Sequence, residues 1–133
     1  MTESEALYHL PETDEVRVLI TGSRDWDDYD TMYDALSKVY DSLKPRNPIL
    51  VHGAARGADT SAETIWRRLG GKTEAHPADW EQYGKRAGFI RNDEMVKAGA
   101  VLCVAFIKNN SKGATMCAKL AEKAQIPTVR YIA

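Results

Sequence analysis

The chain has 133 residues, the length of a single compact domain built around one hydrophobic core. Its 18 lysine and arginine residues against 19 aspartate and glutamate residues give a net charge of -1, which predicts no general attraction to nucleic acid and makes duplex DNA an unfavoured partner. No apolar run approaches the length of a membrane span, and the acidic N-terminus lacks the features of a signal peptide, so we expect a cytoplasmic protein without membrane contact.

Cysteine and histidine are too few and too scattered to predict a disulfide or a metal centre. Cys103 lies in an apolar run and Cys117 in a helical pattern, so both are predicted to be buried free thiols. The three histidines have no metal-ligand spacing with one another or with the cysteines. We therefore expect no metal site.

Residues 1–14 lack any periodic pattern and are predicted to be a flexible N-terminal arm, whose Leu7, Tyr8 and Leu10 are suited to docking on a neighbour. From Val16 onward, strand-like and helix-like runs alternate. The predicted strands are 16–20, 49–52, a short one within 73–80, 101–106 and 128–132, and the predicted helices begin after Asp28, at Ala58, at Ala87 and after "NNSKGA". The residues predicted to face inward are Met32, Tyr33, Leu36, Val39, Tyr40 and Leu43 on the first helix and Met116, Cys117, Leu120, Ala121 and Ala124 on the last.

This alternation predicts an α/β fold: a Rossmann-like, doubly wound parallel sheet of about five strands with helices on both faces, in a single domain of residues 15–133. In the common strand order 3-2-1-4-5, the chain changes direction between strands 1 and 4, and ligands bind beside the carboxyl ends of the strands at that point. Three turns are predicted to meet there: 22–24, 53–57 and 109–113.

The turn "GAARG" stands between a strand and a helix and carries no bulky side chain besides Arg56. Gly53, Ala54 and Gly57 would leave backbone amides open to a ligand, and the helix dipole favours an anion there. Arg56 suits a bidentate contact with phosphate or stacking on a base. The alternative is that the two glycines serve only the chain reversal and close packing of helix on sheet.

The turns after strands 1 and 4 also combine glycine with a basic residue, so they offer a similar site for an anion. Ser111 can cap the following helix, Lys112 can meet negative charge, and Gly113 allows a ligand to come close, although capping alone would explain Ser111. Ser23 and Arg24 stand in the corresponding position after the first strand. Ser23 lacks the surroundings of a hydrolase nucleophile.

The segment "HPADWEQYGKRAGFIRNDEM" places Trp80 beside Arg86, Arg91 and Asn92, a mixture that suits a nucleobase and its phosphates. Its two glycines predict a loop that folds over the site, either within its own chain or across a dimer. The alternative is a solvated basic face with Trp80 in the core. The acids Asp25, Asp27, Asp28 and Asp30 are explained by a helix N-terminus more simply than by a divalent ion.

Four ordered stretches, "VLITGSRDW", "VHGAARGAD", "HPADWEQYGKRAGFIRNDEMV" and "NNSKGAT", resemble the SLOG superfamily, in particular its YspA-like (YpsA-related) branch of small Rossmann-like proteins found in bacteriophages and bacteria. The resemblance implies binding of a nucleotide or nucleotide-derived ligand related to NAD or ADP-ribose, and, as relatives commonly do, formation of a homodimer. It carries over onto Gly22, Ser23, Arg24, Gly53, Arg56, Gly57, Asp59, Arg86, Arg91, Asn92, Ser111, Lys112 and Gly113.

The mechanism of the related LOG phosphoribohydrolases does not transfer, because their PGG loop is absent and the first acid after "NNSKGAT" is Glu122. Transport of DNA, as in the DprA branch, is disfavoured by the neutral charge. Three functions stay open: a nucleotide-binding sensor, carrier or sequestering protein that requires no further cofactor; a hydrolase of an N-glycosidic or phosphoester bond; and a phage factor acting on a host protein. A hydrolase would need Asp59, Asp79 or Glu94 as its acid or base.

Overall fold

The computed structural model describes Thr2, residues 15–44 and residues 46–133, so the predicted arm lies, apart from Thr2, outside the described residues. Five parallel strands form one sheet in the order β3-β2-β1-β4-β5. The strands are β1 (Glu15–Gly22), β2 (Asn47–His52), β3 (Lys72–Ala75), β4 (Leu102–Ile107) and β5 (Thr128–Ile132). The predicted Rossmann-like fold class and strand order are confirmed.

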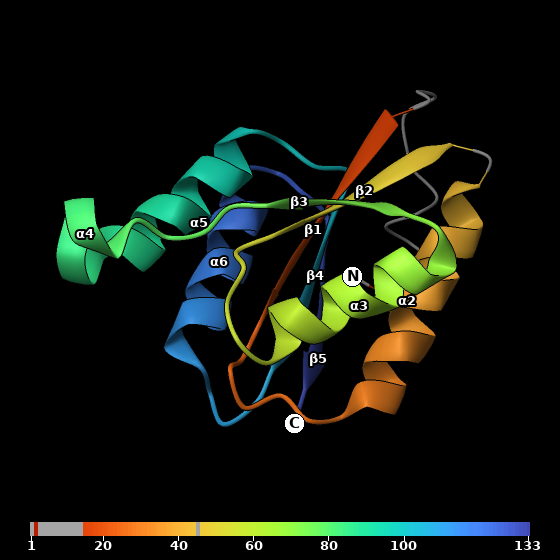
Figure 1. Ribbon diagram of the computed structural model, residues 1–133, viewed down its shortest axis with the longest axis horizontal. Coiled ribbons are helices and arrows are strands. Elements are labelled where there is room, and N and C mark those ends of the chain that lie inside the picture. Colours follow the sequence, from red (N-terminus) through yellow and green to blue (C-terminus); the bar gives the residue numbers. More distant parts are fainter. Residues whose placement is uncertain (1, 3–14, 45) are drawn as a thin grey trace.

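Helices cover both faces of this sheet (Figure 1). The helices are α2 (Tyr29–Leu43), α3 (Ala58–Leu69), α4 (Trp80–Tyr83), the 3-10 helix η1 (Gly84–Arg86), α5 (Ala87–Lys97) and α6 (Lys112–Lys123). The helices α2 and α3 pack on one face, and α5 and α6 pack on the other. The short α4 projects away from the sheet at one end of the molecule.

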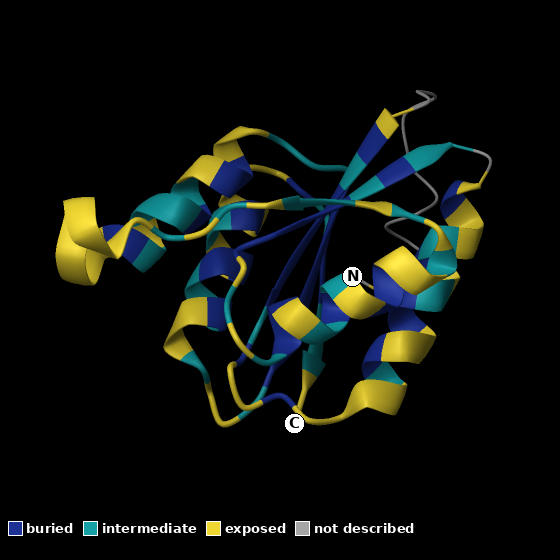
Figure 2. Cartoon of the chain, in the orientation of Figure 1, coloured by how far each residue is buried: buried dark blue, intermediate teal, exposed yellow. Residues whose placement is uncertain are grey.

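The alternation of side chains along the strands divides the core into two layers. Val18 and Ile20 of β1 point toward α2 and α3, whereas Leu19 points toward α5 and α6. β4 is buried along its whole length, as a central strand covered on both faces should be (Figure 2). The strand ends next to it are therefore held in place by packing on both sides.

The structure corrects three expectations. Tyr33 is 45% exposed and stacks on Tyr29 instead of facing the core, because the buried stripe of α2 runs through its smaller and aliphatic residues. Ala124 is exposed because α6 has ended one residue earlier. Finally, residues 80–86 are helical and not part of a loop: the chain breaks at Gly84, whose φ of +57° favours glycine. The helix predicted from Ala87 is confirmed as α5, and Gly88 lies within it.

None of the described helices is both long enough and apolar enough to cross a bilayer. Both cysteines are buried free thiols, as predicted, and burial raises the pKa of Cys117 to about 11.

Candidate functional site

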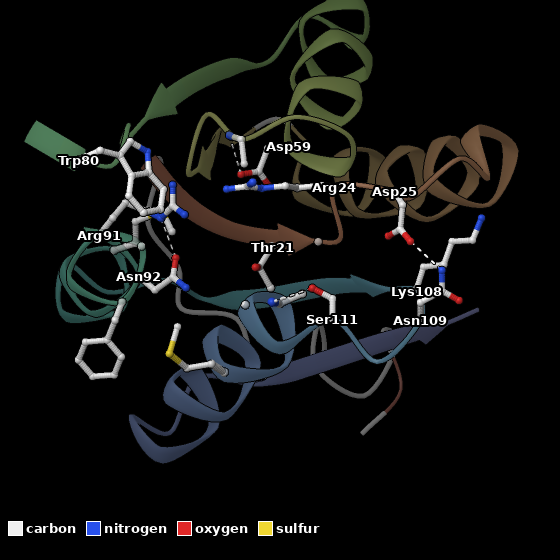
Figure 3. A pocket seen from close by; sticks show the side chains of 18 residues that line it. Thr21, Arg24, Asp25, Asp59, Trp80, Arg91, Asn92, Lys108, Asn109 and Ser111 are labelled. Atoms are coloured by element: carbon white, nitrogen blue, oxygen red, sulfur yellow. Dashed lines mark hydrogen bonds between the residues drawn. The ribbon is translucent and has the colours of Figure 1, made fainter. Parts of the chain in front are cut away.

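A pocket of about 480 Å³ opens at the carboxyl ends of β1 and β4, where the strand order reverses (Figure 3). Its walls come from the turns after β1 and β4, the start of α3 and α6, one side of α5, and Trp80. The described residues that line it are Thr21, Gly22, Arg24, Asp25, Ala55, Asp59, Trp80, Gly88, Phe89, Arg91, Asn92, Met95, Lys108, Asn109, Ser111, Gly113, Ala114 and Met116.

Ser23, one of the predicted site residues, joins the turns beside the pocket and does not line it. Its buried hydroxyl accepts a hydrogen bond from the backbone N–H of Lys108 at 2.7 Å and lies 3.2 Å from the carbonyl oxygen of the same residue. Its own carbonyl accepts from Ala58 N–H at the start of α3. Ser23 therefore fixes the ends of β1 and β4 and the start of α3 relative to one another.

Arg24, the next residue, lines the pocket. Its side chain is exposed, points into the pocket (Figure 3), and has no hydrogen bond or ion pair within the described residues. The neighbouring acids are paired across to the turn after β4: Asp25 accepts from Asn109 Nδ2 at 2.7 Å, and Asp27 from Lys108 Nζ at 2.8 Å. Arg24 is thus a cation of the pocket wall without a partner among the described residues.

The turn after β2 is closed by hydrogen bonds within the chain. Asp59 Oδ2 accepts from the backbone N–H groups of Gly53 and Ala55, at 3.1 and 3.2 Å. His52 Nδ1 accepts from Ala54 N–H at 3.0 Å, and the Gly53 carbonyl accepts from the Arg91 guanidinium. The amides of Gly53 and Ala54, two of those that the sequence suggests for an anion, are therefore already bonded, as is that of Ala55.

Both glycines of this turn are explained by close approach of other parts of the chain. A Cβ at Gly53 would lie 2.4 Å from the Arg91 guanidinium, and one at Gly57 would lie 2.2 Å from the Arg24 carbonyl oxygen. Gly57 also has a φ of +73°. Arg56 is exposed and, like Gly57, is absent from the described lining, so its contact with a ligand stays a prediction.

Asp59 is 5% exposed, and burial raises the pKa of its carboxyl against the opposing effects of the turn amides, His52 and Arg91. Its second oxygen, Oδ1, has no hydrogen-bond partner among the described residues. Of the three acids proposed for a hydrolase, Asp59 lines the pocket, while Asp79 caps α4 and neither Asp79 nor Glu94 is in the described lining. Asp59 therefore both holds the turn and lines the pocket.

Asn92 offers a hydrogen-bond donor whose orientation is fixed. Arg91 Nε can only donate, and it does so to Asn92 Oδ1 at 2.7 Å, so the Asn92 amide nitrogen must occupy the other position. That residue is 5% exposed and lines the pocket, and its nitrogen has no partner within the described part of the chain. In Figure 3 the two side chains lie together below Trp80.

The start of α6 forms the most open wall. Ser111 caps the helix, as predicted, by accepting from Ala114 N–H at 3.4 Å. A Cβ at Gly113 would meet nothing within 4 Å, so this backbone faces free space. Asn109 and Asn110 have φ values of +53° and +52°, a conformation that asparagine adopts more readily than most residues, and Asn109 lines the pocket while Lys112 lies outside it.

Trp80 stands at the rim of the pocket, 52% exposed, with its ring 3.6 Å from where a Cβ at Gly88 would lie. Arg86 is exposed and outside the described lining.

The sequence analysis missed Phe89, which is 47% exposed at the same rim, because aromatic residues at helical spacing ordinarily belong to a core. It also missed Thr21, Asp25 and Lys108, although each stands at or just after a strand end, a position that points to a site, whereas Asn109 belongs to a turn that was predicted to meet there.

Within the described residues, no group of three histidine, cysteine, aspartate or glutamate side chains is placed to hold a metal ion.

Comparisons with known proteins place these features in a family. A family model described as the YspA, cpYpsA-related SLOG family matches residues 16–83. Gene 61 protein of Mycobacterium phage D29 is 48% identical over 122 residues, which cover 86% of this chain and 95% of that protein. No solved structure matches significantly.

Proposed function

This chain belongs to the YspA, cpYpsA-related SLOG family, and on that premise we propose that its pocket binds a nucleotide or nucleotide-derived ligand of the NAD or ADP-ribose kind. The observation that carries the proposal is one pocket with three complementary surfaces: the unpaired Arg24, the oriented amide of Asn92, and the exposed ring of Trp80. Acting as a sensor, carrier or sequestering protein requires nothing more than this binding.

We place the phosphate between Arg24 and the first turn of α6. The helix dipole and the free backbone around Gly113 favour negative charge there, and Arg24 adds a full positive charge that no acid within the described residues neutralises. The turn after β2 is a poorer location for the phosphate, because Asp59 occupies its amides.

We place the base at the opposite rim, against Trp80 and Phe89. Stacking on an aromatic ring tolerates any base, whereas the Asn92 amide nitrogen requires an acceptor on the base or sugar. Membership of the family suggests a nucleotide. The pocket supports this because it offers a cation, Arg24, for a phosphate and aromatic rings, Trp80 and Phe89, for a base.

A hydrolase is the second candidate, and Asp59 is the observation that favours it. A buried carboxyl with a raised pKa beside a ligand pocket is suited to give a proton to a leaving group. The hydrogen bonds of Asp59 to the turn after β2 explain its buried position equally well without any catalytic role. Turnover of a bound nucleotide, followed by chromatography, separates the two functions.

The deciding experiment is mass spectrometry of small molecules released from the purified, denatured protein, followed by calorimetry with AMP, ADP-ribose and NAD. We expect a nucleotide to be released or at least one of the three to bind with a measurable heat. A protein that releases none and binds none of them would overturn the proposal and leave the third function, interaction with a host protein.

We further propose that the protein is a cytoplasmic homodimer. Its exposed aromatic residues Trp80, Tyr83 and Phe89 gather on α4 and α5, and α4 projects where a second copy can reach it. Arg91 already serves the pocket of its own chain, which leaves Arg86 as the residue that a partner can lend. Analytical ultracentrifugation tests this: a monomer at all concentrations would contradict it.

A further inference from the structure

A second hollow, also of about 480 Å³, lies along the outer side of α6, and Met116 lines both this hollow and the pocket. We call it the α6 groove. Its described lining residues are Asn110, Lys112, Thr115, Met116, Lys119, Leu120 and Lys123. Met116 is thus the described residue that the linings of the pocket and the groove have in common.

The groove carries positive charge that the described part of the chain does not neutralise. Lys112, Lys119 and Lys123 are exposed, and none of them has an ion pair within the described residues. The acid between them on the helix, Glu122, is held instead by Arg130, whose Nη1 lies 2.9 Å from its carboxylate.

The pocket itself offers less free positive charge. Lys108 is paired with Asp27, and Arg91 is bonded to Gly53 and Asn92, so Arg24 is the one described lining cation without a partner. Asp25 and Asp59 add carboxylates to the same wall. The pocket is therefore suited to a single phosphate, and further phosphates are better placed among the lysines.

The floor of the groove is apolar. Met116 and Leu120, both half-buried, lie between the lysines. Lys119 and Lys123 lie about 4.5 and 10.5 Å beyond Met116 along the helix axis. Met116 and Leu120 offer an apolar surface on which a base can pack, and the lysines supply positive charge for its phosphate.

We infer that the ligand consists of two nucleotide units joined through phosphate, the first held in the pocket and the second in the α6 groove, with the linkage passing Met116. This inference rests on the proposed function and adds the size and charge of its ligand. A lone mononucleotide would leave the lysines and Leu120 without a role. An acidic peptide would use the lysines but has no reason to continue into the pocket.

Calorimetry with three probes tests the inference: AMP, the linear dinucleotide pApA, in which a phosphodiester joins the units, and NAD, in which a pyrophosphate joins them. We expect pApA or NAD to bind roughly tenfold more tightly than AMP, because the second unit pairs its phosphate with the lysines and packs its base on Met116 and Leu120. The double variant Lys119→Glu/Lys123→Glu should lose that gain while its affinity for AMP stays unchanged. Which of the two ligands shows the gain identifies the linkage.

The matched control is Arg68→Glu/Lys72→Glu, which makes the same change in net charge on the other side of the molecule. It should keep the gain, and melting curves should show that both double variants fold. Equal affinities for AMP and both two-unit ligands would overturn the inference but leave the proposed function standing, whereas binding of none of them would overturn both. Hexaglutamate binding as tightly as the better two-unit ligand, with the same loss in Lys119→Glu/Lys123→Glu, would make the groove a peptide site and also overturn it.

Discussion

The turns after β2 and β4 are both predicted from the sequence to accept an anion, but the structure shows their backbone groups in opposite states. In the turn of residues 53–57, three amides are bonded to Asp59 and His52, and both glycines lie against atoms of their own chain. In the turn of residues 109–113, Ser111 caps the helix, and the space beside Gly113 is open. A turn at the end of a strand can thus bind a ligand only where its backbone N–H groups and the space beside its glycines are not already taken by other parts of the chain.

The largest contrast that we expect is between Gly57→Ala and Gly113→Ala. Gly57→Ala combines a φ of +73° with a Cβ placed 2.2 Å from the Arg24 carbonyl oxygen, and should lower the free energy of unfolding by about 2 to 4 kcal/mol. Gly113→Ala places a better helix former in open space and should raise that free energy by up to about 1 kcal/mol.

Urea unfolding measures both variants. Because the new methyl group of Gly113→Ala enters the pocket, its affinity for AMP should fall although its stability does not. If Gly57→Ala instead unfolds within 0.5 kcal/mol of the wild type, on the order of experimental scatter, the turn after β2 is not held as tightly as its contacts indicate.

The difference between these turns marks the limit of what the sequence could predict. The order of the strands and the meeting of three turns follow from periodicity and from the topology of parallel sheets, and both are confirmed. Which amides remain free depends on Asp59 and His52, and the Gly53 carbonyl is bonded by Arg91, which lies 38 residues further along the chain. Nothing within "GAARG" itself reveals those partners. The helix from Ala87 was predicted, whereas the helical state of residues 80–86 was hidden by glycines that one break at Gly84 accounts for.

The next largest effect that we expect is a difference in stability between variants of Asp59 and Ser111, the residues whose side chains bond the two turns. Asp59→Ala leaves the N–H groups of Gly53 and Ala55 without an acceptor, and should lower the free energy of unfolding by about 2 kcal/mol. Asp59→Asn keeps an amide oxygen for both and should retain most of that stability. Ser111→Ala, the corresponding change in the other turn, should cost about 1 kcal/mol or less, because it removes one cap bond of 3.4 Å near solvent. Equal losses for Asp59→Ala and Ser111→Ala would show that the two turns are held alike.

A smaller effect is expected on AMP binding when Arg24, after β1, and Arg56, after β2, are replaced in turn. Arg24→Ala should weaken AMP binding by about 1.5 kcal/mol, or roughly tenfold, because it removes a charge-assisted contact from the pocket wall. Arg56→Ala removes the same charge from an exposed position outside the described lining and should weaken binding less. Calorimetry on both variants decides the matter, and melting temperatures should stay near that of the wild type. A larger loss for Arg56→Ala would return the phosphate to the turn after β2, as the sequence alone suggests.

The smallest effect that we expect is a pH dependence of the free energy of unfolding that arises from Asp59 in the turn after β2. Burial raises the pKa of Asp59 above its ordinary value of 3.8, so the folded protein keeps this proton to higher pH than the unfolded chain does. The contribution of Asp59 to the free energy of unfolding is therefore complete below that ordinary value and is lost as pH rises through the raised pKa. Asp59→Asn keeps the hydrogen bonds but cannot titrate, and all other groups cancel in the comparison. The free energy of unfolding of the wild type, measured relative to Asp59→Asn by urea unfolding, should thus fall as pH rises above the ordinary pKa of 3.8 and become constant once pH has passed the raised pKa. The opposite slope would mean that the amides of Gly53 and Ala55, together with Arg91, outweigh burial and hold Asp59 as a stabilised carboxylate, and a turn built around such a fixed anion would repel a phosphate even more strongly.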